Sequence, residues 1–317
     1  MIRNMTLQKY PDLMWGDLSF KNFKQVSDIN PQQKDYNWAN VELIKYKDYN
    51  GKIIEGLLYT PENLDRSKKY PMIVYYYERY SHDIHNYYAP RPSASTIHPT
   101  EYASNNYVVF IPDITYDEGH PAKGAYNAIM SGTDHIIKNY SFVDSTKMGL
   151  QGQSWGGYQT AQLVTMTKRF ACAMAGAPVS NMFSAYGGIR WGSGLSRAFQ
   201  YETGQSRIGK NIWEGHNLYM ENSPIFHLPN VTTPLLIMHN DEDGAVPWYQ
   251  GIELYMGLRR LEKKVWLLNY SGDDHNLMKT GNRLDLSIKM KGFFDHYLHG
   301  VDAPKWLIEG VPAVDRH

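Results

Sequence analysis

A serine set among glycines carries the strongest chemical signal in the sequence. The run Gly152-Gln153-Ser154-Trp155-Gly156-Gly157 fits the pattern G-x-S-x-G, follows an expected strand and opens an expected helix beginning near Gly156. A nucleophile lifted above the end of a strand needs a tight, strained turn, and glycines let the backbone pass where a Cβ would collide. The N–H groups at the start of the helix point toward developing negative charge. The pattern therefore predicts Ser154 as a nucleophile.

An acid and a histidine should follow this serine in that order, each just after a strand. The apolar run 235–239 leads into Asp241, Glu242 and Asp243, and the run 265–270 leads into His275. We therefore expect His275 to be the general base. Spacing alone does not choose among the three carboxylates, because any two of them could be solvated loop charges or cap the following helix.

Two other patterns predict no further chemistry. His82 and His85 lack a nearby cysteine and a third ligand, so they do not indicate a zinc site. The segment 204–210 nearly matches a phosphate-binding loop, but Asn211 stands where a Ser or Thr should hold magnesium, and no strand precedes it. We therefore expect neither a metal nor a cofactor.

Short apolar runs alternate with amphipathic stretches and supply the elements that would position these residues. The segments 41–46 and 53–59 are joined through Asn50-Gly51, a strong hairpin signal. The alternation that follows predicts a mostly parallel sheet with an antiparallel start. Further strands are expected at 72–77, 107–111, 148–151, 171–175, 235–239 and 265–270, and helices around 126–137, 254–261 and 290–297. Residues 181–230 break the alternation, and we expect them to cross the carboxyl edge of the sheet.

The composition is that of a soluble globular protein. Of 317 residues, 42% are hydrophobic and 20% charged, and Lys plus Arg equals Asp plus Glu at 32 each, which favours neither nucleic acid nor a membrane surface as a partner. No run reaches the ~18 apolar residues of a membrane span, and the first 30 residues contain no signal-peptide core. We expect a soluble protein, cytoplasmic or periplasmic, without deciding the compartment. The single cysteine, Cys172, is expected to fill the core.

The segment from Gly152 to Tyr158 resembles the nucleophile motif of the prolyl oligopeptidase family, especially its dipeptidyl-peptidase and acyl-aminoacyl-peptidase-like branches. The likeness covers about residues 40–300. His239, Asp243 and Val246 resemble the acid loop of that family, which selects Asp243 as the acid. The resemblance implies the α/β-hydrolase fold, a mostly parallel eight-stranded sheet with helices on both faces. It also implies a triad of Ser154, Asp243 and His275.

The family also provides candidates for the oxyanion hole. The run that begins at Tyr70 resembles the strand that ends in the family's oxyanion tyrosine. Counting along it makes Tyr77 the counterpart, with Tyr76 the alternative if the register slips by one. The second donor would be the backbone N–H of Trp155. The family's usual arginine–glycine turn after the next strand is replaced here by the residues 112–116.

The resemblance assigns Val179 and Val246 to the substrate pocket. Met182 and Ala185 stand where dipeptidyl peptidases carry the aromatic residues that cage proline, so the sequence gives no support for proline specificity and leaves the preferred side chain undecided. The expected function is a serine peptidase that hydrolyses oligopeptides through an acyl-enzyme. A carboxylesterase or another small acyl hydrolase of the same fold is the alternative. A catalytically idle interaction module is a third hypothesis, against which the intact triad argues.

Residues 1–36 do not look like the start of a domain. They contain two strand-like segments, 13–18 and 23–26, and a linker at 30–34. They resemble the end of the β-propeller that precedes the catalytic domain in this family. We therefore expect residues 37–317 to be the catalytic domain and the chain to be part of a longer two-domain peptidase. A homo-oligomer is compatible with the sequence, which does not decide it.

Overall fold

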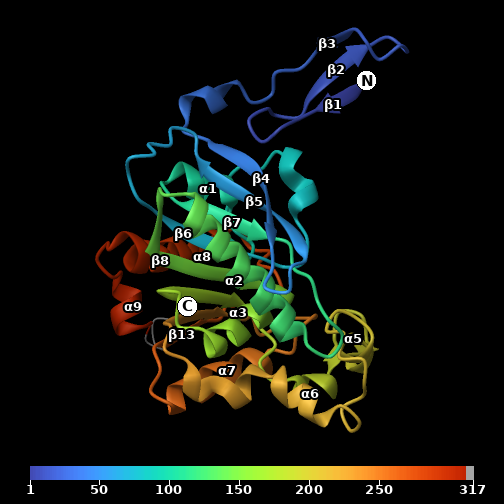
Figure 1. Ribbon diagram of the computed structural model, residues 1–317, viewed down its shortest axis with the longest axis vertical. Coiled ribbons are helices and arrows are strands. Elements are labelled where there is room, and N and C mark those ends of the chain that lie inside the picture. Colours follow the sequence, from blue (N-terminus) through green and yellow to red (C-terminus); the bar gives the residue numbers. More distant parts are fainter. Residues whose placement is uncertain (312–317) are drawn as a thin grey trace.

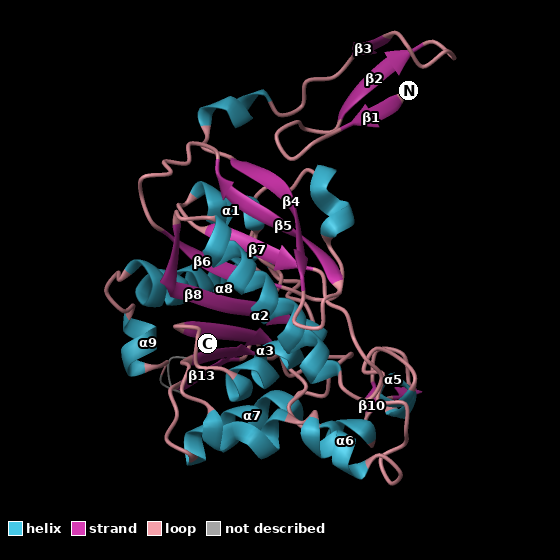
Figure 2. Cartoon of the chain, in the orientation of Figure 1, coloured by secondary structure: helices cyan, strands magenta, loops and turns pink. Residues whose placement is uncertain are grey.

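The computed structural model describes residues 1–311, and its main feature is an eight-stranded mixed sheet (Figures 1 and 2). The strand order is β13-β12-β9-β8-β6-β7-β5-β4. The hairpin β4–β5 and the pair β5–β7 are antiparallel, and all other neighbouring pairs are parallel. The strands are β4 (Ala39–Lys47), β5 (Ile53–Pro61), β6 (Tyr70–Tyr75), β7 (Val108–Pro112), β8 (Val143–Gln153), β9 (Cys172–Gly176), β12 (Leu235–Met238) and β13 (Val265–Leu268).

Helices cover both faces of this sheet because successive side chains of a buried strand point to opposite sides. In β6, Met72 and Val74 face one hydrophobic core, while Ile73 and Tyr75 face the other. The first core is closed by α2 (Pro121–Asn139), α3 (Trp155–Met166) and α7 (Tyr249–Arg260). The second is closed by α1 (Pro99–Ser104), α8 (Thr280–Phe294) and α9 (Lys305–Glu309), with the π-helical turn η4 (Asp295–His299) between the last two. The predicted fold class is therefore confirmed.

The end of β6 differs from the prediction in a way that matters for the site. The apolar run predicted a strand over 72–77, but β6 ends at Tyr75. Tyr76 and Tyr77 therefore lie beyond the last ladder hydrogen bonds, at the carboxyl edge of the sheet. Tyrosine is enriched in strands, so propensity extended the predicted strand through both residues and could not locate its end.

The excursion between β9 and β12 consists of short elements. Figure 1 shows α5 and α6 together at one side of the molecule, beyond the end of the sheet. Because these elements are short and irregular, their positions depend on side-chain contacts with the sheet edge rather than on helix periodicity. The elements are α4 (Met182–Tyr186), β10 (Ile189–Arg190), β11 (Leu195–Ser196), α5 (Ala198–Glu202), α6 (His216–Glu221) and the 3₁₀ segment η3 (Pro224–Asn230).

A small three-stranded sheet precedes the large one and projects from it (Figure 1). It contains β2 (Asp12–Gly16) and β3 (Phe23–Gln25), as predicted, and also β1 (Ile2–Asn4). The third strand was missed because three residues are too few to show a period. The predicted linker is in part the 3₁₀ helix η1 (Pro31–Asp35), whose first residue is a proline with a φ already suited to a helix.

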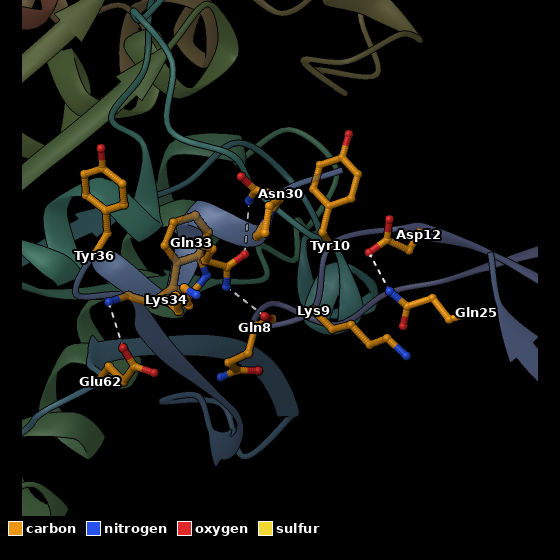
Figure 3. A pocket seen from close by; sticks show the side chains of 12 residues that line it. Gln8, Lys9, Tyr10, Asp12, Gln25, Asn30, Gln33, Lys34, Tyr36 and Glu62 are labelled. Carbon is orange, nitrogen blue, oxygen red and sulfur yellow. Dashed lines mark hydrogen bonds between the residues drawn. The ribbon is translucent and has the colours of Figure 1, made fainter. Parts of the chain in front are cut away.

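Residues 1–36 contact the rest of the chain at two places. Leu7 is buried with 1% exposure, and its carbonyl accepts a hydrogen bond of 2.8 Å from Trp38 Nε1. Asn30 and Gln33 both bond to the hydroxyl of Tyr87. A cavity of about 360 Å³ lies between these attachment points, and its lining residues come from both parts of the chain (Figure 3). The segment is thus docked near its start and near its end, while β1 and β3 are largely exposed and β2 is half-buried.

No helix among residues 1–311 is both long enough and apolar enough to cross a membrane. Cys172, expected in the core, is buried on β9, and burial raises the pKa of its thiol well above the usual value.

Candidate active site

Ser154 lies at a strained turn between β8 and α3. Its backbone has φ 60° and ψ −113°, a conformation that L-residues rarely adopt and that costs roughly 1–3 kcal/mol. A Cβ at Gly152 would collide with the carbonyl group of Gly156, and a Cβ at Gly156 would collide with the Tyr76 carbonyl oxygen. The Ser154 N–H donates a bond of 2.8 Å to the Gly176 carbonyl, which fixes the turn to β9. The glycines of the motif are therefore required by close backbone approach.

The structure brings Asp243 and His275 together. Asp243 follows β12 and His275 follows β13, and Nδ1 of His275 lies 2.7 Å from Oδ2 of Asp243. The Asp243 side chain is fully buried, whereas 18% of the His275 side chain is exposed. The other carboxylate oxygen accepts bonds of 2.8 Å from the N–H groups of Ala245 and Val246. These donors hold the carboxylate in one orientation.

A second histidine contacts the same carboxylate. His239 is fully buried, and its Nε2 lies 3.3 Å from Oδ2 of Asp243 and 3.2 Å from the Val246 carbonyl oxygen. A neutral imidazole with its proton on Nε2 can donate to both acceptors, so no charge on His239 is required. Burial alone would raise the pKa of Asp243, but hydrogen bonds from His239 and His275 outweigh it and hold that pKa below its usual value. Asp243 is therefore a stable carboxylate.

Hydrogen bonds tie the three loops at the ends of β8, β12 and β13 to one another. Nε2 of Gln153, the residue before Ser154, donates a hydrogen bond of 2.9 Å to the His275 carbonyl oxygen. Oδ1 of Asp274 accepts a hydrogen bond of 2.8 Å from the Gly244 N–H. The Asn240 side chain donates a hydrogen bond of 2.7 Å to the Asp274 carbonyl oxygen. The spacing of the site is thus set by polar contacts between loops, in addition to the strands beneath them.

The competing candidates lie elsewhere. Oδ1 of Asp241 accepts a hydrogen bond of 2.7 Å from the Gly272 N–H. The Glu242 side chain is exposed. His82 lies on a surface turn, where Nε2 is 3.5 Å from Asp83. Across residues 1–311, no three His, Cys, Asp or Glu side chains gather in a way that could hold a metal ion.

The two candidate tyrosines point in different directions. Tyr76 is fully buried in the first core, and its hydroxyl bonds Thr160 Oγ1 at 2.8 Å. Tyr77 is partly exposed and packs with the residues around Trp155. Its hydroxyl oxygen accepts 3.0 Å from Gln205 Nε2. Since Gly156 passes against the Tyr76 carbonyl, Tyr77 lies next to the start of α3.

The segment that replaces the family's arginine–glycine turn supports Tyr77. The Tyr116 hydroxyl accepts hydrogen bonds from Trp155 Nε1, at 2.8 Å, and from Gln159 Nε2, at 2.6 Å. It donates a hydrogen bond of 3.3 Å to the Tyr77 carbonyl oxygen. Gln159 Nε2 also lies 2.8 Å from that carbonyl oxygen. The Tyr77 backbone is therefore held by α3 and by the loop after β7.

The structure brings Val179 and Val246 into one apolar cluster with Trp155, the residue after Ser154, and 4% and 3% of their surfaces are exposed. Met182 and Ala185 belong to the same cluster, and three buried tyrosines supply aromatic rings that the sequence did not locate. The cluster comprises Trp155, Tyr158, Val179, Met182, Ala185, Tyr201, Ile208, Tyr219 and Val246.

Two polar residues at the site were missed by sequence reasoning, and both come from the excursion between β9 and β12. Arg197 is fully buried, and its guanidinium donates to the Ala245 carbonyl oxygen in the acid loop and to the Tyr201 hydroxyl. Gln205 reaches the Tyr77 hydroxyl. The broken alternation located the segment over the sheet edge, but no local pattern marked these side chains.

The family model and two relatives that match this chain are described as peptidases. Residues 99–301 match the prolyl oligopeptidase family. The chain is 26% identical over 288 residues to the uncharacterized peptidase YuxL of Bacillus subtilis, covering 87% of this chain and 42% of YuxL. It is 26% identical over 276 residues to dipeptidyl-peptidase 5 of Porphyromonas endodontalis, covering 81% of this chain and 36% of that protein. The chain thus spans less than half the length of these relatives.

A solved structure shows the same fold. The acylaminoacyl peptidase of Pyrococcus horikoshii superposes with a TM-score of 0.75 at 18% sequence identity, covering 97% of this chain and 49% of that one. This likeness, at such low identity, concerns the fold.

Substituting Gly156→Ala tests the close approach at the nucleophile turn. We expect the added methyl group to push against the Tyr76 carbonyl and to lower the free energy of unfolding by about 1–3 kcal/mol. Gly187→Ala is the matched control, because nothing lies within 4 Å of its added Cβ. Denaturant unfolding of both variants measures the difference, and equal stabilities would contradict the geometry.

Proposed function

Because the chain belongs to the prolyl oligopeptidase family, we propose that it is a serine peptidase that hydrolyses peptide bonds of oligopeptides through Ser154, His275 and Asp243. The observation that carries the proposal is the pair of a buried Asp243 and a partly exposed His275 at 2.7 Å, on loops hydrogen-bonded to the strained turn that holds Ser154. Such an arrangement is the requirement for nucleophilic acyl transfer.

The hydrogen bond to Asp243 determines how His275 acts. With Nδ1 donating to the carboxylate, Nε2 is the nitrogen left to take the proton from Ser154 as its Oγ attacks the carbonyl carbon. The imidazolium then gives that proton to the leaving amine, and water hydrolyses the acyl-enzyme. Asp243 fixes the tautomer and stabilises the imidazolium, and its lowered pKa keeps it charged throughout.

The backbone N–H of Trp155 and the hydroxyl of Tyr77 are proposed to hold the oxyanion. As the first residue of α3, Trp155 has an N–H without an acceptor inside the helix. Each donor in such a hole contributes about 3–4 kcal/mol to stabilising the transition state. Tyr76 is unsuited to the role, because its hydroxyl is buried against Thr160.

The substrate side chain next to the cleaved bond is proposed to enter the apolar cluster that contains Val179 and Val246. Its aliphatic and aromatic residues favour an apolar side chain over a charged one. Neither valine carries a charge or a hydrogen-bonding side chain, so selectivity there would depend on size and shape.

We also propose that residues 1–36 and residues 37–317 are separate units, with the first belonging to a further N-terminal domain such as a β-propeller. The support is the apolar surface on the small sheet, where Trp15, Leu18 and Phe20 expose 59%, 95% and 68% of their surfaces. Contiguous exposed apolar residues of this size often mark an interaction face.

Substrate choice tests the peptidase proposal. The protein should cleave alanyl-, prolyl- or other aminoacyl-anilides, and Ser154→Ala should abolish that turnover. A fluorophosphonate probe should label Ser154, as located by mass spectrometry. Fast hydrolysis of acyl esters without detectable amide cleavage would favour the esterase instead. Failure of the folded protein to react with the probe would contradict both.

Asp243→Asn should lower kcat by about 10⁴-fold, because an amide favours the wrong imidazole tautomer. Asp241→Asn and Glu242→Gln are the matched controls and should retain nearly full turnover, since neither side chain contacts His275. Steady-state kinetics on one anilide compares the three, and a larger loss at Asp241 would move the acid to that position.

Leu7→Ala tests the boundary between the two proposed units. Removing this buried side chain should cost about 2–5 kcal/mol of docking and expose residues 1–36 to proteolysis. The exposed Leu18→Ala is the control and should be cut no faster than the original chain. The fragment left after cleavage should retain anilide turnover. Unfolding of that fragment would show that residues 1–36 belong to the catalytic unit.

A further inference from the structure

Gln205 contacts the proposed oxyanion tyrosine from a segment far along the chain. Its Nε2 lies 3.0 Å from the Tyr77 hydroxyl oxygen. We propose that Gln205 is a positioning residue, which donates to that oxygen and so leaves the phenolic proton free for the oxyanion. The inference rests on the function proposed above and adds a residue to it.

A chain of hydrogen bonds fixes the direction of the Gln205 amide. The guanidinium of Arg190 can only donate, and Nη1 donates 3.1 Å to Oε1 of Gln200. The amide nitrogen of Gln200 therefore faces Gln205, and donates to its Oε1 at 3.4 Å. The Gln205 oxygen is then the accepting end and its nitrogen faces Tyr77. Arg190, which can only donate, thus sets the direction of this series of hydrogen bonds, and the Tyr77 hydroxyl oxygen faces an N–H donor.

This polarity matters because a phenol has one proton. If the neighbouring group were an acceptor, the Tyr77 proton would be directed to it and away from the substrate. An amide N–H instead occupies an acceptor position of the hydroxyl oxygen. A hydroxyl that accepts a hydrogen bond is also polarised into a better donor. Gln205 therefore orients the proton and strengthens its donation.

The loop that carries Gln205 is fixed to the residue after Tyr77. Arg207 donates to the Gln205 carbonyl oxygen, and its Nη1 lies 3.2 Å from Oε1 of Glu78. Its guanidinium also lies 4.6 Å from the centre of the Tyr116 ring. Tyr77 is thus held at its backbone by Tyr116 and at its hydroxyl by Gln205, which leaves little freedom to the ring.

Two nearly isosteric substitutions separate this role from simple packing. Gln205→Met removes the donor and should lower kcat about fivefold. Gln205→Glu supplies an acceptor that captures the phenolic proton and should lower kcat about 10²-fold, close to the loss in Tyr77→Phe. KM should change little in both. Gln32→Glu, an exposed site on the N-terminal segment, makes the same chemical change and should leave turnover unchanged.

A pH profile and a double substitution complete the test. As the pH falls from about 8 to about 5, the introduced carboxyl begins to protonate and can donate again, so the Gln205→Glu deficit relative to the original chain should shrink. The Gln205→Met deficit should stay constant. In the Tyr77→Phe background, neither Gln205 substitution should lower kcat further.

The outcomes distinguish this inference from the function on which it rests. If Tyr77→Phe loses turnover while both Gln205 variants keep full activity, the role proposed for Gln205 is overturned and the assignment of Tyr77 stands. Equal losses in Gln205→Met and Gln205→Glu that persist in the Tyr77→Phe background would show packing instead. If Tyr77→Phe has full activity, the oxyanion assignment and the role of Gln205 fall together. Circular dichroism and thermal unfolding establish that each variant is folded.

Discussion

The tight passage of the backbone around Ser154 is the constraint on which the rest of the site depends. Gly156 lies so close to the Tyr76 carbonyl that no side chain fits between them, and this contact joins the start of α3 to the end of β6. The strain at Ser154 is tolerated because β8, β9 and α3 pack around the turn. Tyr77 is the next residue in the chain after Tyr76, so this one contact constrains the positions of both Ser154 and Tyr77.

A second constraint is electrostatic. A buried carboxylate needs hydrogen bonds to remain charged, and Asp243 receives them from two histidines and two backbone N–H groups. His239 contacts the carboxylate from a fully buried position, and His275 is the partly exposed histidine of the two. The same loop is bonded to Asp274 and, through Ala245, to Arg197. The charge and the geometry of the pair thus come from one set of contacts.

The strands and the order of the triad candidates were predictable, because buried strands are continuous apolar runs and the G-x-S-x-G turn needs glycine at set positions. The family resemblance selected Asp243, which spacing alone could not, since three adjacent carboxylates look equivalent in a loop. The third strand of the small sheet and the end of β6 were not predictable, because both depend on pairing partners. Gln205 lies in a run whose only local pattern is a near match to a phosphate-binding loop, because a contact to a residue 128 positions away leaves no signal in the local sequence.

The excursion between β9 and β12 therefore does more than cover the sheet edge. One stretch of it places Arg197 against the acid loop and Gln205 against Tyr77. Burying a guanidinium whose acceptors are the neutral Ala245 carbonyl and Tyr201 hydroxyl is unfavourable in itself, and such a group is retained where it holds something in place. Short helices and a two-residue hairpin would not stay ordered alone. The contacts that order this segment therefore include contacts to Tyr77 and to the loop that carries Asp243.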